Sequence, residues 1–143
     1  MKSKAKKFMS ILLLLIISLT LFILPVNADE QTRSKYYDTI TTSAGVVSGV
    51  LNIHNSYTVS SNTGFTSAEI HTYVERRVLG IFWFKVDNGQ PDKTWVDTST
   101  AKVYTKNYTL SLTQTGTYRV TAEYTFYGSS GSESITMQKT VTY

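Results

Sequence analysis

The sequence predicts an all-β protein: an antiparallel β-sandwich of about seven strands that follows a secretory signal peptide. Three observations lead to this prediction. The residues after position 28 are rich in Thr, Ser, Tyr and Val, which favour strands and turns. Polar and apolar residues alternate with a period of two in several segments, and no helical period lasts for three turns. Turn signals separate these segments at regular spacing, as in sandwich domains.

The first 28 residues have the three parts of a signal peptide. Lysines precede an uncharged run from Ile11 to Leu24, Pro25 ends that run, and Ala28 supplies a small residue for cleavage. A retained membrane anchor is the alternative, although a spanning helix needs about 20 apolar residues. The chain has no cysteine, which excludes a lipoprotein and disulfides. We therefore expect secretion, cleavage after about Ala28, no wall-anchor signal, and one domain over residues 29–143.

The charge of the chain is concentrated in this leader. Four of the fourteen basic residues lie there, whereas all ten acidic residues follow Ala28, so the remaining chain is formally neutral. Bulk charge gives no support for binding to nucleic acid. The expected partners are an extracellular protein, a glycan or another cell-surface component.

Alternation also predicts which side chains face the core. Residues 68–77 and 118–127 alternate most clearly, and the chain ends on a third such segment. The expected inward sets are Ala68, Ile70, Thr72, Val74 and Arg76; Tyr118, Val120, Ala122, Tyr124 and Phe126; and Ile135, Met137, Val141 and Tyr143. The glycines of residues 44–54, AGVVSGVLNIH, predict a strand with a bulge, and residues 87–93 predict a loop.

Residues 78–86, VLGIFWFKV, are nearly all apolar. Gly80 predicts a turn, after which Ile81, Trp83 and Lys85 share one face of a strand. Because Lys85 marks that face as exposed, we expect Ile81 and Trp83 to be exposed. The opposite set, Phe82, Phe84 and Val86, is expected in the core.

The segment YTLSLTQTGTYRVTA resembles the corner between strands E and F of immunoglobulin-like and fibronectin-III-like sandwiches. The resemblance covers some 15 residues. It implies that Gly116 makes the corner and that the Tyr118 hydroxyl bonds to upstream backbone. Val120 stands where antibody domains carry a cysteine. The layout also resembles small secreted proteins of Gram-positive bacteria that have no known activity.

No pattern in the chain predicts catalysis. His54 and His71 are the only histidines, no Gly-x-Ser-x-Gly elbow is present, and cysteine chemistry is excluded. The loop aspartates 87, 92 and 97 lack the close alternation of an EF-hand and fit turns better. We therefore expect no enzyme, no metal and no cofactor.

The surplus of aromatic residues is the remaining signal, because exposed Tyr and Trp on a rigid sheet suit glycan stacking or protein contact. The candidate contact residues are Arg76, Arg77, Ile81, Trp83, Tyr73 and Tyr127. The first hypothesis is a secreted, non-enzymatic binding module. The alternative is a membrane-active toxin or antimicrobial factor that acts through the basic and aromatic hairpin at residues 76–86.

Overall fold

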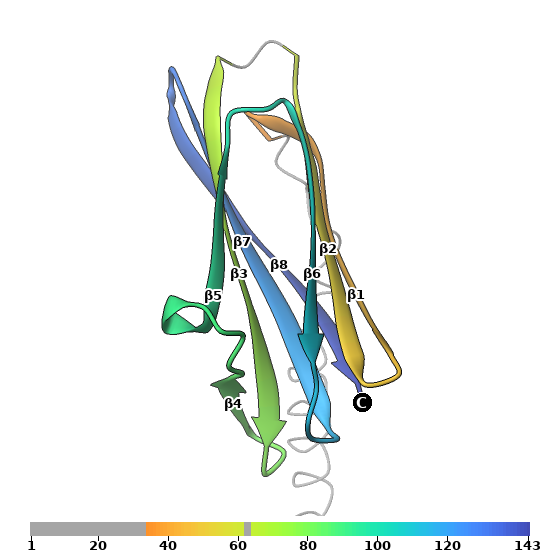
Figure 1. Ribbon diagram of the computed structural model, residues 1–143. Coiled ribbons are helices and arrows are strands. Elements are labelled where there is room, and N and C mark those ends of the chain that lie inside the picture. The colour runs from red at the N-terminus through yellow and green to blue at the C-terminus, as the bar shows by residue number, and fades with distance from the viewer. Residues whose placement is uncertain (1–33, 62–63) are drawn as a thin grey trace, which may run out of the picture. The chain divides into compact units, whose positions relative to one another are not determined.

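A computed structural model describes residues 34–61 and 64–143, and these residues form an antiparallel β-sandwich (Figure 1). The predicted signal peptide lies outside the described residues. The strands are β1 (Tyr37–Val47), β2 (Val50–Val59), β3 (Phe65–Val78), β4 (Phe82–Lys85), β5 (Thr94–Ser99), β6 (Val103–Ser111), β7 (Thr117–Gly128) and β8 (Gly131–Thr142). A short 3-10 helix, η1 (Pro91–Lys93), precedes β5 within the predicted loop. The predicted all-β sandwich is confirmed.

The two sheets differ in size. One has three strands in the order β1-β2-β6, and the other has five, in which β4-β3-β7-β8 form a continuous path. The fifth strand, β5, pairs with residues 68–73 of β3, while β4 pairs with residues 75–78. These two short strands therefore occupy successive stretches of the same edge of β3.

The inner faces of β3 and β7 supply the centre of the core. On β3 the fully buried side chains are those of Ala68, Ile70, Thr72 and Val74. The predicted inward set on β7 is also fully buried, except that Tyr118 retains slight exposure. The alternation predicted for these two strands is confirmed. Two apolar clusters result, one around Tyr57, Tyr124 and Phe126 and the other around Leu51, Val74 and Val120.

A polar pair lies between the two clusters. Asn55 and Thr72 are both fully buried, and the Asn55 amide nitrogen donates to the Thr72 hydroxyl at 2.7 Å. The Asn55 carbonyl oxygen has no hydrogen-bond partner within the described residues. Because a buried polar atom is costly to leave unpaired, this pair constrains how β2 and β3 face each other.

The corner before β7 is fixed by a local hydrogen bond. The Tyr118 hydroxyl donates to the backbone carbonyl of Gln114, four residues upstream, as the tyrosine-corner pattern predicts. Gly116 and Tyr143 exchange backbone hydrogen bonds at 2.8 and 3.0 Å, which ties the end of the chain to this corner.

The prediction of a bulged strand near Gly49 is wrong. Val47 pairs with Val50, so Ser48 and Gly49 form a two-residue hairpin turn between β1 and β2. Both have positive φ, 50° for Ser48 and 77° for Gly49, as a type I′ turn requires. Glycine is compatible with both a β-bulge and a hairpin turn. Which of the two forms depends on which strand the flanking residues pair with.

Candidate binding surface at the β3–β4 hairpin

The turn between β3 and β4 has an unusual residue in a demanding conformation. Leu79 and Gly80 have positive φ values of 52° and 74°, and the Ile81 amide donates to the Val78 carbonyl at 3.3 Å. Positive φ at both central positions is the type I′ signature, which strongly favours Asn, Asp or Gly. Leu79 is nevertheless 85% exposed. A branched apolar side chain therefore adopts a left-handed conformation without being buried by the fold.

The prediction that Phe82 and Phe84 belong to the core is wrong. Their exposed fractions are 53% and 58%, and their ring centroids lie 6.4 Å apart. Val86, the third member of that set, is partly buried and packs against the second core cluster. Ile81 is 68% exposed, so the exposure predicted for Ile81 is confirmed.

The exposure of the two phenylalanines follows from the mismatch between the sheets. The three-stranded sheet ends at β6, whose Tyr108 stacks on Trp95 of β5 with ring centroids 4.7 Å apart. β4 pairs only with β3 among the described residues. Its inner face therefore lies beyond the end of β6 (Figure 1), and no strand of residues 34–61 or 64–143 covers it.

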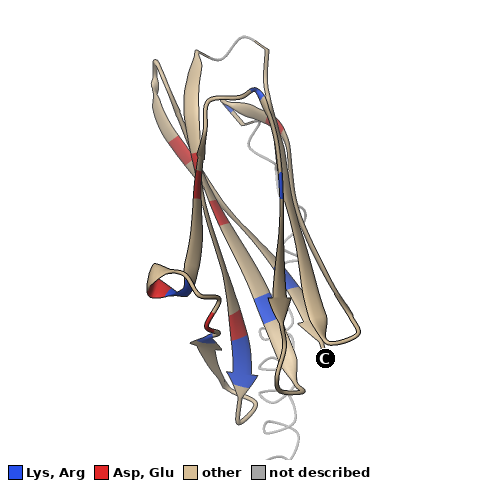
Figure 2. Ribbon diagram, viewed as in Figure 1, with Lys and Arg blue, Asp and Glu red and all other residues tan. Residues whose placement is uncertain are grey.

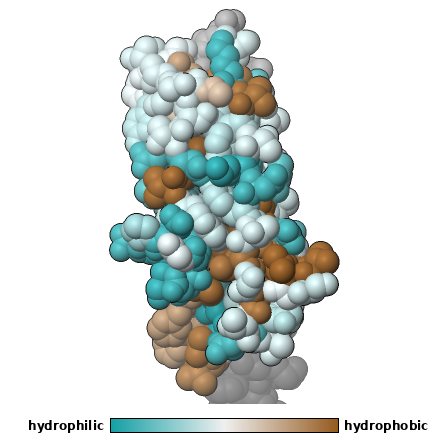
Figure 3. All heavy atoms as spheres, viewed as in Figure 1, coloured by the Kyte–Doolittle hydropathy of each residue, from teal (hydrophilic) through white to brown (hydrophobic). Residues whose placement is uncertain are grey.

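Leu79, Ile81, Phe82 and Phe84 lie close together in the sequence, in the turn and on β4, and all four are exposed; we call these four side chains the hairpin patch. Figure 3 shows apolar surface at the end of the domain where β4 and the β3–β4 turn lie. The other large apolar side chains with high exposure, such as Val96 and Val103, come from other strands. The hairpin patch is thus a local cluster with no structural role in the core.

Trp83 is half-buried rather than fully exposed, which corrects the prediction made for it. The Arg119 guanidinium lies 4.4 Å from the centroid of the Trp83 ring, and that of Arg77 lies 5.9 Å away. Both distances fall within the range of cation–π contact. The fold itself therefore occupies much of the ring surface that was expected to contact a partner.

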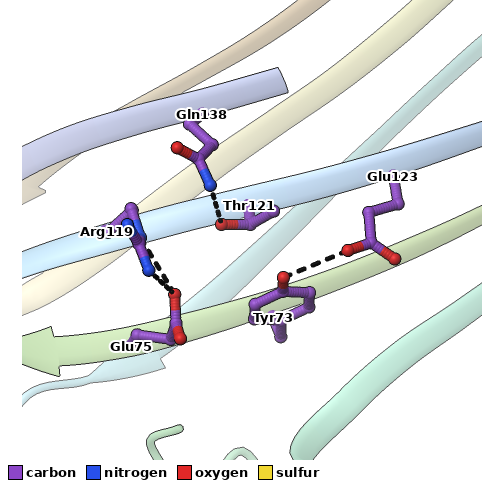
Figure 4. Close-up of polar contacts among 6 residues, drawn as sticks. All are labelled: Tyr73, Glu75, Arg119, Thr121, Glu123 and Gln138. Atoms are coloured by element: carbon purple, nitrogen blue, oxygen red, sulfur yellow. Dashed lines mark hydrogen bonds and ion pairs between the residues drawn. The ribbon is translucent and has the colours of Figure 1, made fainter. Parts of the chain in front are cut away.

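Arg119 also belongs to a polar cluster on the outer face of the larger sheet (Figure 4). Its Nε and Nη2 atoms donate to the same oxygen of Glu75 at 2.9 and 2.7 Å. Nearby, the Tyr73 hydroxyl donates to Glu123 at 3.1 Å, and the Lys85 ammonium lies 4.2 Å from the Tyr73 ring centroid. Burial, and then the hydrogen bond to Glu123, raises the pKa of Tyr73. Cross-strand pairs of this kind stabilise the sheet and satisfy each other.

The six predicted contact residues separate into three places. Tyr73, Arg77 and Trp83 lie on the outer face of the five-stranded sheet, and Ile81 lies beside them in the turn. Arg76 is on the opposite face, where it donates to the Gln114 side chain and to the Thr115 carbonyl.

Tyr127 lies apart from the other candidates. It pairs with Ser67 and Ser132 near the far end of β7, six positions beyond the partner of Tyr73. Leu79, Phe82 and Phe84 were missed as surface residues. A leucine before glycine at a hairpin turn is the signal that could have identified the first of them.

Charge is unevenly distributed along the strands (Figure 2). The half that carries the β3–β4 hairpin has six basic and three acidic residues: Arg76, Arg77, Lys85, Lys93, Arg119 and Lys139 against Glu75, Asp87 and Asp92. The other half has three basic and five acidic residues: Lys35, Lys102 and Lys106 against Asp38, Glu69, Asp97, Glu123 and Glu133. The described residues thus present a basic end and an acidic end.

The remaining titratable residues that the structure describes lie in several separate places. His54 contacts Asn107 at 2.8 Å on the smaller sheet, whereas His71 pairs with Glu69 on the larger one. Within the described residues, no group of His, Cys, Asp or Glu could hold a metal ion. Asp87 accepts the Gly89 amide at 2.9 Å, which is a turn contact. Among residues 34–61 and 64–143, no helix is long and apolar enough to cross a membrane.

Comparison with protein-family models finds no match to this chain, and a search of curated proteins finds none.

Proposed function

We propose that this chain is an exported, non-enzymatic binding domain that contacts its partner through the hairpin patch. The observation that carries the proposal is that Leu79, Ile81, Phe82 and Phe84 are all exposed within one hairpin, with the two phenylalanine rings 6.4 Å apart. Contiguous apolar surface on a soluble domain commonly marks a site of interaction. Export is supported by the leader, and the absence of a catalytic pattern in the sequence supports a binding role.

The proposal includes an immunoglobulin-like or fibronectin-III-like sandwich. The sheet order β1-β2-β6 against β4-β3-β7-β8 and the Tyr118 hydrogen bond to Gln114 support it. Domains of this architecture serve many unrelated functions, so the fold does not indicate a ligand. The function is argued from the hairpin patch alone.

The alternative, a toxin that permeabilises membranes, has less support. β4 has four residues, which at a rise of about 3.3 Å per residue covers roughly 13 Å. The hydrocarbon core of a bilayer is about 30 Å thick. The hairpin patch therefore suits contact with a surface better than passage through one.

The test uses purified residues 29–143, which contain both sheets and both core clusters. The probes are a glycan array, insoluble peptidoglycan, immobilised extracellular matrix proteins and lipid vesicles. We expect the wild-type chain to bind one of these classes, and the double variant Phe82→Ser/Phe84→Ser to lose most of that binding. The matched control is Val96→Ser/Val103→Ser, which removes two exposed apolar side chains elsewhere. Equal binding by the two double variants, or no binding to any probe, would contradict the proposal.

A further inference from the structure

We propose that the partner of the hairpin patch is an anionic lipid surface, which Leu79 and Ile81 enter to the depth of the headgroup boundary. This inference rests on the proposed function, because it names a partner for the same contact surface. Three independent features of the described residues point to it: the conformation of the turn, the shape of the patch, and the charge around it.

The conformation of Leu79 favours a role outside folding. A non-glycine residue in the left-handed region is strained, and such strain is retained where function needs it. The β1–β2 turn offers an internal comparison, since Ser48 and Gly49 adopt the same pair of positive φ values. There the first position is an exposed polar residue, as the turn type favours. At the β3–β4 turn the chain has leucine instead, with 85% of its surface exposed.

The patch has the shape of a tip. Leu79 and Ile81 lie in the turn itself, and Phe82 and Phe84 continue on one face of a four-residue edge strand. In Figure 1 this turn lies at one end of the described strands, beyond the end of β6. A narrow projecting tip can enter a fluid surface, whereas a second protein would need a groove of matching shape. With a reach of roughly 13 Å along β4, the tip stays within one leaflet.

Basic residues lie on both strands of the hairpin that carries the tip. Arg77 precedes the turn and is exposed, and Lys85 follows Phe84 at the other end of β4. Glu75, the nearest acidic residue on β3, is neutralised by the paired hydrogen bonds of Arg119. Basic and aromatic residues beside an apolar insertion are the combination that binds anionic interfaces. The half-buried Trp83 ring contacts the guanidinium groups of Arg77 and Arg119, and tryptophan is a residue type that favours the membrane boundary.

The charge of the whole domain would orient it. The hairpin half carries an excess of three basic residues over acidic ones, and the other half carries an excess of two acidic residues. A negatively charged surface therefore attracts the hairpin end and repels the opposite end. A neutral lipid surface would give no such orientation, so the inference is specific for anionic lipid.

The experiment measures sedimentation of residues 29–143 with vesicles. One set contains equal parts of phosphatidylcholine and phosphatidylglycerol, and the other contains phosphatidylcholine alone. We expect binding to the mixed vesicles, much weaker binding to the neutral ones, and a loss of affinity as salt screens the charges. Leu79→Asn is expected to weaken binding by about tenfold, as follows from the burial of one apolar side chain. Arg77→Gln is expected to weaken it by about fivefold.

Two controls separate binding from folding. Leu79→Asn introduces the residue that the turn favours, so its melting temperature should not fall, and reduced binding cannot be ascribed to misfolding. Val103→Asn alters an exposed apolar residue at the other end of the domain and should leave binding unchanged. A dye enclosed in the vesicles should stay inside, because the tip is too short to cross.

Three results would overturn the inference: equal binding to neutral and anionic vesicles, full binding by Leu79→Asn, or release of the dye. Its failure can be told apart from failure of the proposed function. If no vesicle binds but Phe82→Ser/Phe84→Ser abolishes binding to a glycan or protein probe, the lipid partner is wrong and the contact surface is right. If no probe of any kind binds, both proposals fail.

Discussion

Substitutions at the first residues of the two type I′ turns should change stability in opposite directions. Leu79→Asn relieves left-handed strain, which costs about 1–2 kcal/mol for an ordinary residue and less for Asn. Leu79 is 85% exposed, so the variant gives up only about 0.3 kcal/mol of apolar burial. The free energy of unfolding should therefore rise by about 0.5–1 kcal/mol, and the melting temperature by about 2–5 °C.

The reciprocal change, Ser48→Leu, places leucine in the matching position of the β1–β2 turn, where φ is also positive. It should lower the free energy of unfolding by about the same 0.5–1 kcal/mol. Urea unfolding of residues 29–143, followed by tryptophan fluorescence, measures both variants against the parent. If Leu79→Asn instead destabilises the domain, the leucine contributes to folding, and its exposure and strain would no longer indicate a contact surface.

Three further predictions concern the core. Tyr118→Phe removes the hydroxyl that donates to the Gln114 carbonyl and should lower the free energy of unfolding, measured by urea unfolding, by about 1–2 kcal/mol. An unchanged free energy of unfolding would mean that this hydrogen bond is dispensable. Thr72→Val leaves the buried Asn55 amide unpaired and should lower the free energy of unfolding by about 1–3 kcal/mol. Adding Asn55→Leu should recover most of that loss, and a Thr72→Val variant as stable as the parent would contradict this expectation. Burial, and then the charge of Asp97, raises the pKa of Tyr104 above its ordinary value of 10. The Tyr104 hydroxyl therefore ionises first in the unfolded chain, and stability should fall as the pH rises past 10; a free energy of unfolding that stays constant above pH 10 would refute this.

Alternation predicted the inner faces of β3 and β7 correctly because both are central strands of the larger sheet, with the facing sheet over one side. The Tyr118 corner was also predictable, since the donor and acceptor lie only four residues apart in the sequence. Local patterns are informative where the structure they specify is itself local, or where a strand is covered along its whole length.

The same alternation failed at β4 for a physical reason. A period of two separates Phe82 and Phe84 from Trp83, but it does not say which of the two faces is covered. That depends on where β6 ends the smaller sheet and on which strand pairs with β3, and both depend on long-range contacts. The cation–π contact between Trp83 and Arg119 joins strands 36 positions apart in the sequence, so no local pattern indicates it.

The candidate surface therefore arises from a mismatch between the sheets rather than from a motif. β4 continues the edge of β3 beyond the end of β6 (Figure 1), and no strand among the described residues covers its inner face. A domain selected for stability alone would put polar residues on that face and asparagine in its turn. This chain has phenylalanine at positions 82 and 84 and leucine at position 79, so each departure adds apolar surface at the same place. Meanwhile the tryptophan and tyrosine that seemed best suited to bind are engaged by the chain's own arginine and lysine. The proposed contact surface is therefore argued from exposed residues that lie outside the core, rather than from the residue types most common in binding sites.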